Sequence, residues 1–200
     1  MLKTLAMLVS DSETSDLTLV CGEERRRVHS FLLTNRSPYF RASLAFVESS
    51  EGRREIEVKD CTPEVLTQAV NFIYGVEIED DFTDHAGLLD IAVKFKMQDL
   101  KDEVGMLIAK ELDQDNYLEI GRRAEKYEAD LLAEKCARFV LHKASDVDWD
   151  EIKRLPMVTD HYMRIAKELM DQAKHLRKYM FNETYAAKGD GIINELLKYE

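Results

Sequence analysis

The chain has 200 residues, of which 45% are apolar and 34% charged, with three prolines and eight glycines. This composition excludes a disordered chain and is typical of a globular, helix-rich protein with one large domain or two small ones. The net charge of −11 argues against a nucleic-acid partner, because neutralising phosphates takes an excess of Lys and Arg.

The three cysteines, Cys21, Cys61 and Cys136, are too few and too far apart for a disulfide framework. We therefore expect a reducing compartment, the cytoplasm or the nucleus. The opening apolar run, MLKTLAMLV, is too short for a signal-peptide core with its cleavage site, and no later segment has the apolar length of a membrane span. The sequence predicts a soluble protein with no membrane partner.

Residues 2–9 predict a helix with an apolar strip along one side, formed by Leu2, Leu5, Leu8 and Val9. Two interpretations are open. The strip packs on its own domain, or it binds a second copy of the chain, since a terminal helix rarely closes a core by itself.

A hairpin follows this helix. The run LTLVC at 17–21 is apolar and β-rich, Gly22 marks a turn, and RRRV at 25–28 supplies a second strand with a polar outer face. Phe31 and Leu32 then have the spacing of a first short helix.

A second helix begins near Pro38, which suits a first helical turn, and Tyr39, Ala42 and Phe46 fall along it. Phe46 stands where the sequence changes to Glu, Ser, Gly and Arg, an unusual position for a core side chain. REIEV at 54–58 predicts another short strand. The local pattern therefore leaves the role of Phe46 unexplained.

Thr62 before Pro63 and Glu64 is a strong helix start, and this helix has a wide apolar face and ends at Gly75. The block up to about residue 110 thus mixes short strands with helices. We predict an α+β fold for it.

The segment from Asp84 onward resembles itself after a shift of 32 residues, which places Asn116 at the second of two N-cap positions. Successive helical hairpins that bury one face on the last give such self-similarity. We expect stacked helix pairs, then a short helix at 149–155 and a charged helix with a narrow apolar stripe at 158–181.

No constellation of catalytic groups is visible in the sequence. The five histidines lack metal-site spacing, and no glycine-rich phosphate loop is present. Cys21 in an apolar strand favours an inert thiol, and His29 before a helix favours a structural histidine. We predict no catalytic, metal-binding or cofactor-binding residue, and a binding module in preference to an enzyme that uses Cys21 or His29.

The stretch SDLTLVCGEERRRVHSFLLTNRSPYFRASL, at 15–44, resembles the opening of a BTB/POZ domain. Its features follow the family's order: Ser-Asp, a hairpin, His before a Leu-rich helix, and then Arg-Ser-x-hydrophobic-Phe. IEVKDCTPEVLTQAVNFIYG and LLDIAVKFKMQDLKDEV are similar to the family's next strand, helix and helical pair. The helices at 116–147 resemble the BACK region, whose first part is called the 3-box in cullin-binding members.

The resemblance implies a BTB/POZ domain at 1–112, with a short mixed sheet flanked by helices. BACK/3-box-like helices follow at 113–156, and a helical extension at 157–200 has no role that the resemblance defines. Kelch repeats, a MATH domain, zinc fingers and ankyrin arrays are not recognisable in the sequence, and Gly75 replaces the Thr that commonly follows the family's Phe-Ile-Tyr. A substrate-receiving part is therefore not recognisable.

The resemblance also implies a role for Phe46. BTB adaptors that bind the cullin-3 scaffold carry a hydrophobic-x-Glu motif just after the corresponding helix, and Phe46, Val47 and Glu48 match it. The hydrophobic side chain enters a cleft of the cullin in such proteins. The alternative is that Phe46 packs under its own loop. The expected cullin contact extends to three further residues, Tyr74, Tyr117 and Ile120.

Family analogy places Asp16 and Arg36 in a charged pocket at a dimer interface; the alternative is a partnered pair that holds the fold together. We therefore predict a non-catalytic adaptor that homodimerises, binds cullin-3 and brings an unidentified substrate protein to a RING ubiquitin ligase. The alternative function is a BTB oligomerisation scaffold for a transcriptional or cytoskeletal complex, without cullin binding.

Overall fold

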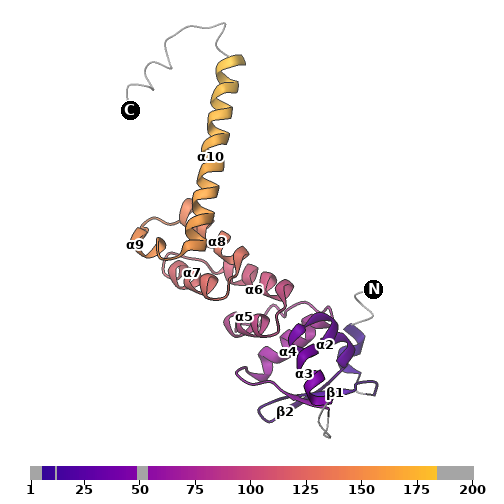
Figure 1. Ribbon diagram of the computed structural model, residues 1–200. Coiled ribbons are helices and arrows are strands. Elements are labelled where there is room, and N and C mark those ends of the chain that lie inside the picture. Colours follow the sequence, from indigo (N-terminus) through magenta and orange to yellow (C-terminus); the bar gives the residue numbers. More distant parts are fainter. Residues whose placement is uncertain (1–5, 12, 49–53, 184–200) are drawn as a thin grey trace.

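The computed structural model describes residues 6–11, 13–48 and 54–183. A small mixed unit lies at the N-terminal end, stacked helices follow it, and a long helix projects from the far end (Figure 1). The elements in chain order are a 3-10 helix (Leu8–Ser10), β1 (Leu17–Cys21), β2 (Glu24–Val28), α2 (Ser30–Arg36), α3 (Pro38–Glu48), β3 (Glu55–Glu57), α4 (Pro63–Ile73), α5 (His85–Lys94), α6 (Gln98–Lys110), α7 (Tyr117–Lys126), α8 (Asp130–His142), α9 (Trp149–Ile152) and α10 (Pro156–Glu183).

The sheet of the described residues has three strands in the order β2-β1-β3. β2 pairs with β1 antiparallel through the turn at Gly22, whose φ of +60° favours glycine. β3 pairs with β1 in parallel, so the chain crosses over through α2 and α3 between them. Leu17, Leu19 and Cys21 are buried on the inner face of β1. The predicted α+β fold is confirmed.

An aromatic cluster fixes α3 against the end of α5. The rings of Phe40 and Phe95 are fully buried with their centroids 4.5 Å apart, and Tyr39 stacks on Phe95 at 5.2 Å. Ser37 Oγ donates a hydrogen bond of 2.6 Å to the carbonyl oxygen of Phe95. The start of α3 is therefore anchored, which sets the direction in which its outer face points.

The helices α7 and α8 repeat α5 and α6, because each of their bounds lies 32 residues further along the chain. The turns repeat as well: Lys96 and Glu128 have φ of +55° and +49°. The next amide in each turn, that of Met97 or Ala129, donates to the carbonyl five residues earlier. The predicted stacked helix pairs are confirmed.

The short helix α9 begins 32 residues after α7 but ends at Ile152, earlier than the expected Leu155. A proline disfavours helical geometry at the residue that precedes it. Pro156 is the first residue of α10, so Leu155 separates the two helices. α10 therefore starts two residues before the expected position and runs to Glu183.

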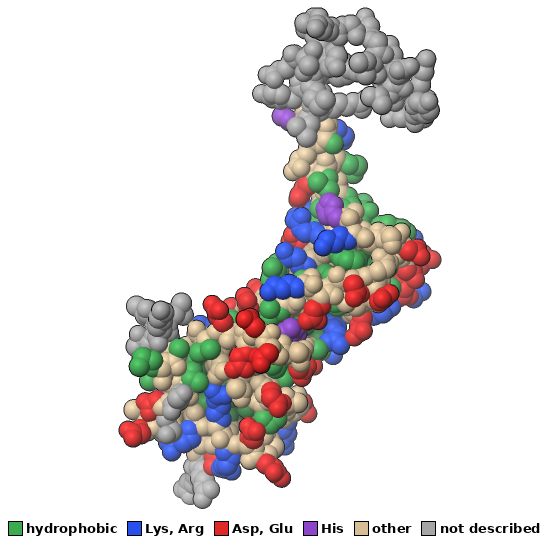
Figure 2. Space-filling model, turned by 180° about the vertical axis from the view of Figure 1, so that it is seen from behind, with side chains coloured by type: hydrophobic (Ala, Val, Ile, Leu, Met, Phe, Trp, Pro, Cys, Tyr) green, Lys and Arg blue, Asp and Glu red, His purple; other side chains and the backbone are tan. Residues whose placement is uncertain are grey.

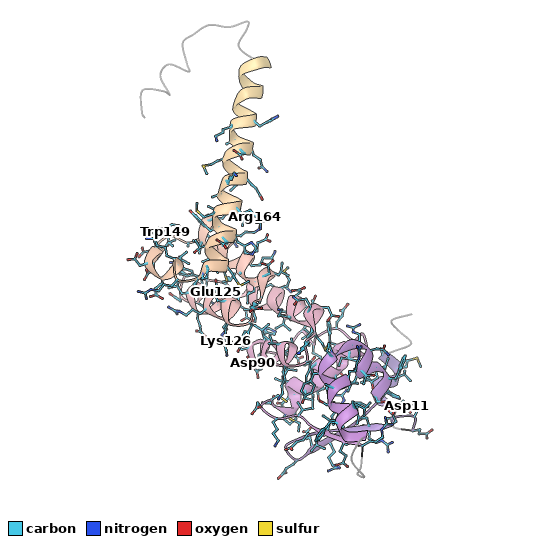
Figure 3. All side chains as sticks on the ribbon, in the orientation of Figure 1. Asp11, Asp90, Glu125, Lys126, Trp149 and Arg164 are labelled. Atoms are coloured by element: carbon cyan, nitrogen blue, oxygen red, sulfur yellow. The ribbon has the colours of Figure 1, made fainter. Side chains whose placement is uncertain are left out.

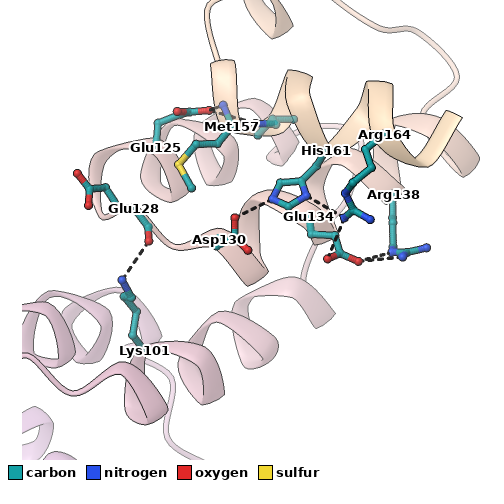
Figure 4. A network of polar contacts seen from close by, with 10 residues as sticks. Lys101, Glu125, Glu128, Asp130, Glu134, Arg138, Met157, His161 and Arg164 are labelled. Carbon is teal, nitrogen blue, oxygen red and sulfur yellow. Dashed lines mark hydrogen bonds and ion pairs between the residues drawn. The ribbon is translucent and has the colours of Figure 1, made fainter. Parts of the chain in front are cut away.

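Polar contacts join the first turns of α10 to α7 and α8 (Figure 4). Glu125 Oε1 accepts the amide hydrogen of the second residue of α10 at 2.7 Å. His161 Nε2 lies 2.9 Å from Asp130 Oδ1, and Arg164 lies 3.4 Å from Glu134. These contacts set the angle at which α10 leaves the helical stack.

Within the part of α10 whose side chains are described, the apolar stripe packs against the rest of the chain near the start of the helix. Trp149 of α9, labelled in Figure 3, lies beside the start of α10. Its ring meets that of Tyr162 edge-on, with centroids 5.3 Å apart, and Ile165 is buried. Leu169 is 40% exposed, and the side chain of Leu176 lies outside the described residues. Among the described helices, none is both long and apolar enough to cross a membrane.

Candidate protein-interaction site

Phe46 lies on the last turn of α3 with 76% of its surface exposed. The helix buries Phe40 and Leu44, and Phe46 follows Leu44 by two positions, about 200° around the helix axis. The same geometry that buries these two residues therefore points Phe46 outward. The structure disagrees with the alternative in which this ring is enclosed by its own fold.

A cleft of about 620 Å³ lies beside Phe46, between α3 and β3. Tyr39, Ala42 and Phe46 give it an apolar wall on the helix side. Glu55 and Glu57 of β3 line the other side. The cleft can receive an apolar side chain of a partner.

Sequence reasoning identified Phe46 but not the strand side of this cleft. Glu55 and Glu57 reach α3 only because β3 pairs in parallel with the central strand β1. Lys96 joins the lining from the turn between α5 and α6, where it has a positive φ. No local signal predicts these juxtapositions, since they depend on the crossover.

Val47 and Glu48 complete the sequence motif and end α3, but their side chains lie outside the described residues. Their contact with a partner stays a prediction.

Tyr74 does not lie on the surface. It is 1% exposed, and its hydroxyl accepts the His29 amide hydrogen at 2.9 Å and lies 2.8 Å from His29 Nδ1. Burial raises the pKa of this phenol above its usual value. Nε2 of the same histidine lies 2.9 Å from Thr14 Oγ1. The expected contact of Tyr74 with a cullin is therefore wrong for this conformation, because the ring belongs to the core.

Tyr117 and Ile120 are also core residues, 4% and 8% exposed. The Tyr117 hydroxyl accepts the amide hydrogen of Asp148 at 3.1 Å, which fixes the N-cap of α9. The apolar face of α7 that carries Ile120 is covered by the helical stack. The expected direct contact of these two side chains with a partner is corrected in the same way.

The predicted dimerisation strip is only partly described. Leu2 and Leu5 lie outside the described residues, whereas Leu8 and Val9 are partly buried against the core of their own chain. Figure 2 shows hydrophobic side chains at the surface of the N-terminal unit. The large apolar side chains of this unit that are at least 73% exposed are Met7, Phe31 and Phe46.

Asp16 and Arg36 do not pair with each other. Asp16 accepts hydrogen bonds from the amide and hydroxyl of Ser30, at 2.7 and 2.6 Å, and lies 2.9 Å from Arg54. Arg36 lies 2.6 Å from Asp99. The expectation of a single partnered pair is therefore wrong, and each residue instead joins different segments of the same chain.

The pKa of Asp16 is lowered from its ordinary value. Burial raises it, but the hydrogen bonds from Ser30 and the charge of Arg54 together outweigh that effect. The carboxylate form is thus the one that the fold binds at the start of α2.

The described residues contain no group of three His, Cys, Asp or Glu side chains that is arranged to hold a metal ion. Cys21 is 2% exposed in β1, and the two ring nitrogens of His29 form hydrogen bonds with Tyr74 and Thr14. The surface beside α3 is thus the candidate site that the sequence and the structure share.

Residues 5–112 match the family model of the BTB/POZ domain. This match covers more than half of the 200-residue chain, and the chain therefore belongs to the BTB/POZ domain family. Proteins with this domain are in general interaction modules without catalytic activity.

Two curated relatives combine the BTB/POZ domain with a MATH domain in their names. BTB and MATH domain-containing protein 40 of Caenorhabditis elegans is 31% identical over 151 residues, which are 72% of this chain and 37% of that protein. BTB/POZ and MATH domain-containing protein 4 of Arabidopsis thaliana is 28% identical over 149 residues, 66% of this chain and 32% of that protein.

Human Kelch-like protein 21 is 25% identical over 158 residues, 78% of this chain and 26% of that protein. A solved structure, the BTB domain of zebrafish PATZ1, is 23% identical, with a TM-score of 0.46 and coverage of 55% of this chain and 89% of that one. The chain spans between a quarter and two fifths of the length of these three curated relatives.

Proposed function

We propose that the chain is a non-catalytic adaptor that binds a cullin-3 scaffold through Phe46 and recruits a substrate protein to a RING ubiquitin ligase. The placement of Phe46 carries the proposal: its ring is 76% exposed at the end of α3, beside a cleft of about 620 Å³. In the cullin-3-binding proteins that the sequence resembles, this position holds a hydrophobic-x-Glu motif. Glu48 completes that motif here.

A rigid aromatic ring suits this role energetically. An aromatic side chain that enters a dry pocket of a partner typically supplies about 2–4 kcal/mol of binding free energy. The start of α3 is held by the buried Phe40–Phe95 contact, so the helix loses little conformational freedom when it binds. The ring is thus presented on an element that is already ordered.

The two glutamates of β3 that line the cleft are already paired with cations of the same chain. Glu55 pairs with Arg25, and Glu57 lies 3.3 Å from Lys59. Lys96 also lines the cleft, so its strand side carries no excess negative charge, and recognition of a partner here rests on the apolar wall that α3 provides.

The helical region that follows has a supporting role in the proposal. The BACK/3-box-like helices at 113–156 stack on the BTB/POZ domain through the 32-residue repeat and continue its surface. With Tyr117 and Ile120 in the core, any contact with the cullin comes from exposed positions of the same helices.

Homodimerisation is part of the same proposal. A dimer formed through the N-terminal strip carries two cullin arms, which raises the effective concentration of ligase around one substrate. Leu8 and Val9 of the strip are partly buried against the core of their own chain, so the proposed dimer contact uses the part of these side chains that stays exposed. The proposed place of action is the cytoplasm, the nucleus or both.

Titration calorimetry with the N-terminal domain of cullin-3 tests this function. Saturable binding at one cullin per chain supports the adaptor. An intact dimer that gives no heat with cullin-3 contradicts the adaptor and supports the BTB oligomerisation scaffold instead.

A further inference from the structure

Two cysteines that are 40 residues apart in the chain meet where the central strand of the sheet ends. Cys21 Sγ lies 3.6 Å from Cys61 Sγ and 3.3 Å from the Cys61 carbonyl oxygen. Cys21 ends β1, and Cys61 follows β3 just before α4. The parallel pairing of these strands brings them together, since the Val58 amide donates to the Val20 carbonyl at 2.8 Å.

The two thiols differ in accessibility. Cys21 is 2% exposed, whereas Cys61 is only partly buried and both are free in the structure. Cys61 lies in a short connection without regular structure between β3 and α4. A sulfur–sulfur bond is about 2.05 Å long, so closing this bond requires the two sulfur atoms to approach each other by on the order of 1.5 Å.

We propose that Cys21 and Cys61 form a redox modification site that closes reversibly to an intramolecular disulfide. Glutathione disulfide is the class of oxidant that fits the chemistry. The Cys61 thiolate attacks one sulfur of glutathione disulfide, which forms a mixed disulfide and releases one glutathione. The Cys21 thiolate then attacks the Cys61 sulfur and releases the second glutathione. Two electrons and two protons thus leave the cysteine pair, and one glutathione disulfide becomes two glutathione thiols.

The surroundings of Cys61 make this reaction slow at neutral pH. Burial is the main cause that raises the pKa of the thiol to about 12, and Cys21 and Asp60 raise it further. The ammonium of Lys94, on α5, lowers it. Only the thiolate attacks a disulfide, so the rate of closure rises roughly tenfold per pH unit around neutral pH.

The disulfide encloses the part of the chain that carries the interaction site. The segment from Cys21 to Cys61 contains β2, α2, α3 and β3, and therefore Phe46 and both walls of the cleft. A cross-link across such a segment reduces the conformational freedom of the unfolded chain. We expect the melting temperature to rise on the order of 10 °C in the oxidised form.

The test uses the full chain in buffers of defined glutathione to glutathione disulfide ratio. After quenching with acid, denaturation and alkylation with N-ethylmaleimide, intact mass counts the free thiols. We expect three alkylated cysteines in the reduced chain and one, Cys136, in the oxidised chain, together with a tryptic peptide pair linked through Cys21 and Cys61.

The matched control is Cys136→Ser, which removes a cysteine that is 1% exposed on α8 and distant from the pair. This variant still closes the disulfide, whereas Cys61→Ser forms none and loses the rise in melting temperature. Three thiols that persist in oxidising buffer, a stable glutathione adduct on Cys61, or disulfides between chains would each overturn the proposal. No cullin enters the experiment, so its result is independent of the proposed adaptor function.

Discussion

Truncating Phe46 should weaken cullin-3 binding with little effect on the fold. A phenylalanine presents at most about 150–250 Å² of surface, and 76% of that of Phe46 is exposed, which leaves roughly 110–190 Å² to bury against a partner. At about 25 cal/mol per Å², this area corresponds to roughly 3–5 kcal/mol before the cost of ordering. Measured hot-spot truncations of about 2–4 kcal/mol correspond to a roughly 30- to 900-fold weaker Kd.

Titration calorimetry of Phe46→Ala against the N-terminal domain of cullin-3 measures this loss. Phe31→Ala is a matched control, because Phe31 is 73% exposed on α2 and does not line the cleft. The two variants should unfold within about 0.5 kcal/mol of the parent chain. Equal affinities of Phe46→Ala and the parent chain would refute the assignment of Phe46 as the anchor.

Three further predictions concern the fold around the site. Asp16→Ala should lower the free energy of unfolding by about 1 kcal/mol at neutral pH, because it removes the acceptor of the Ser30 amide at the start of α2. The pKa of the Asp16 carboxyl is lowered in the folded chain, so the stability difference between the parent chain and Asp16→Ala is present above about pH 4 and disappears as the pH falls through the folded pKa. Chemical denaturation at a series of acidic pH values measures this loss. Tyr74→Phe should lower the free energy of unfolding by about 1–2 kcal/mol and leave cullin-3 affinity unchanged, because the Tyr74 hydroxyl is buried. A loss of cullin-3 affinity in calorimetry would show instead that Tyr74 contacts the partner. Gly121→Ala should destabilise the chain by about 1 kcal/mol, because the new Cβ lies 2.8 Å from Leu155, whereas Gly105→Ala, with its nearest atom at 3.6 Å, should be neutral or stabilising in thermal melts.

The helical part of the fold was predictable because its signals are local. The N-cap at Asp84 accepts the amide hydrogen of Gly87 at 2.9 Å, as its position in the sequence indicates. The 32-residue self-similarity of the sequence predicts that the helices and the turns between them repeat. The turns at Lys96 and Glu128 do repeat, since both residues have a positive φ. The sequence therefore contains both the helices and the way they stack.

The parts that sequence reasoning missed depend on contacts between distant segments. A tyrosine at the end of an apolar helix has the same local pattern whether it faces outward or, like Tyr74, bonds His29 inside the core. The approach of Cys21 to Cys61 and the strand wall of the cleft at Glu55 both arise from the parallel pairing of β3 with β1. That pairing follows a crossover whose geometry no short motif specifies.

The adaptor function is tested most directly by native mass measurement of the chain purified together with the N-terminal domain of cullin-3. We predict a complex of two chains with two cullin domains, and we predict that the Phe46→Ala chain remains a dimer without bound cullin. A parent chain that emerges free of cullin at micromolar concentrations would contradict the account.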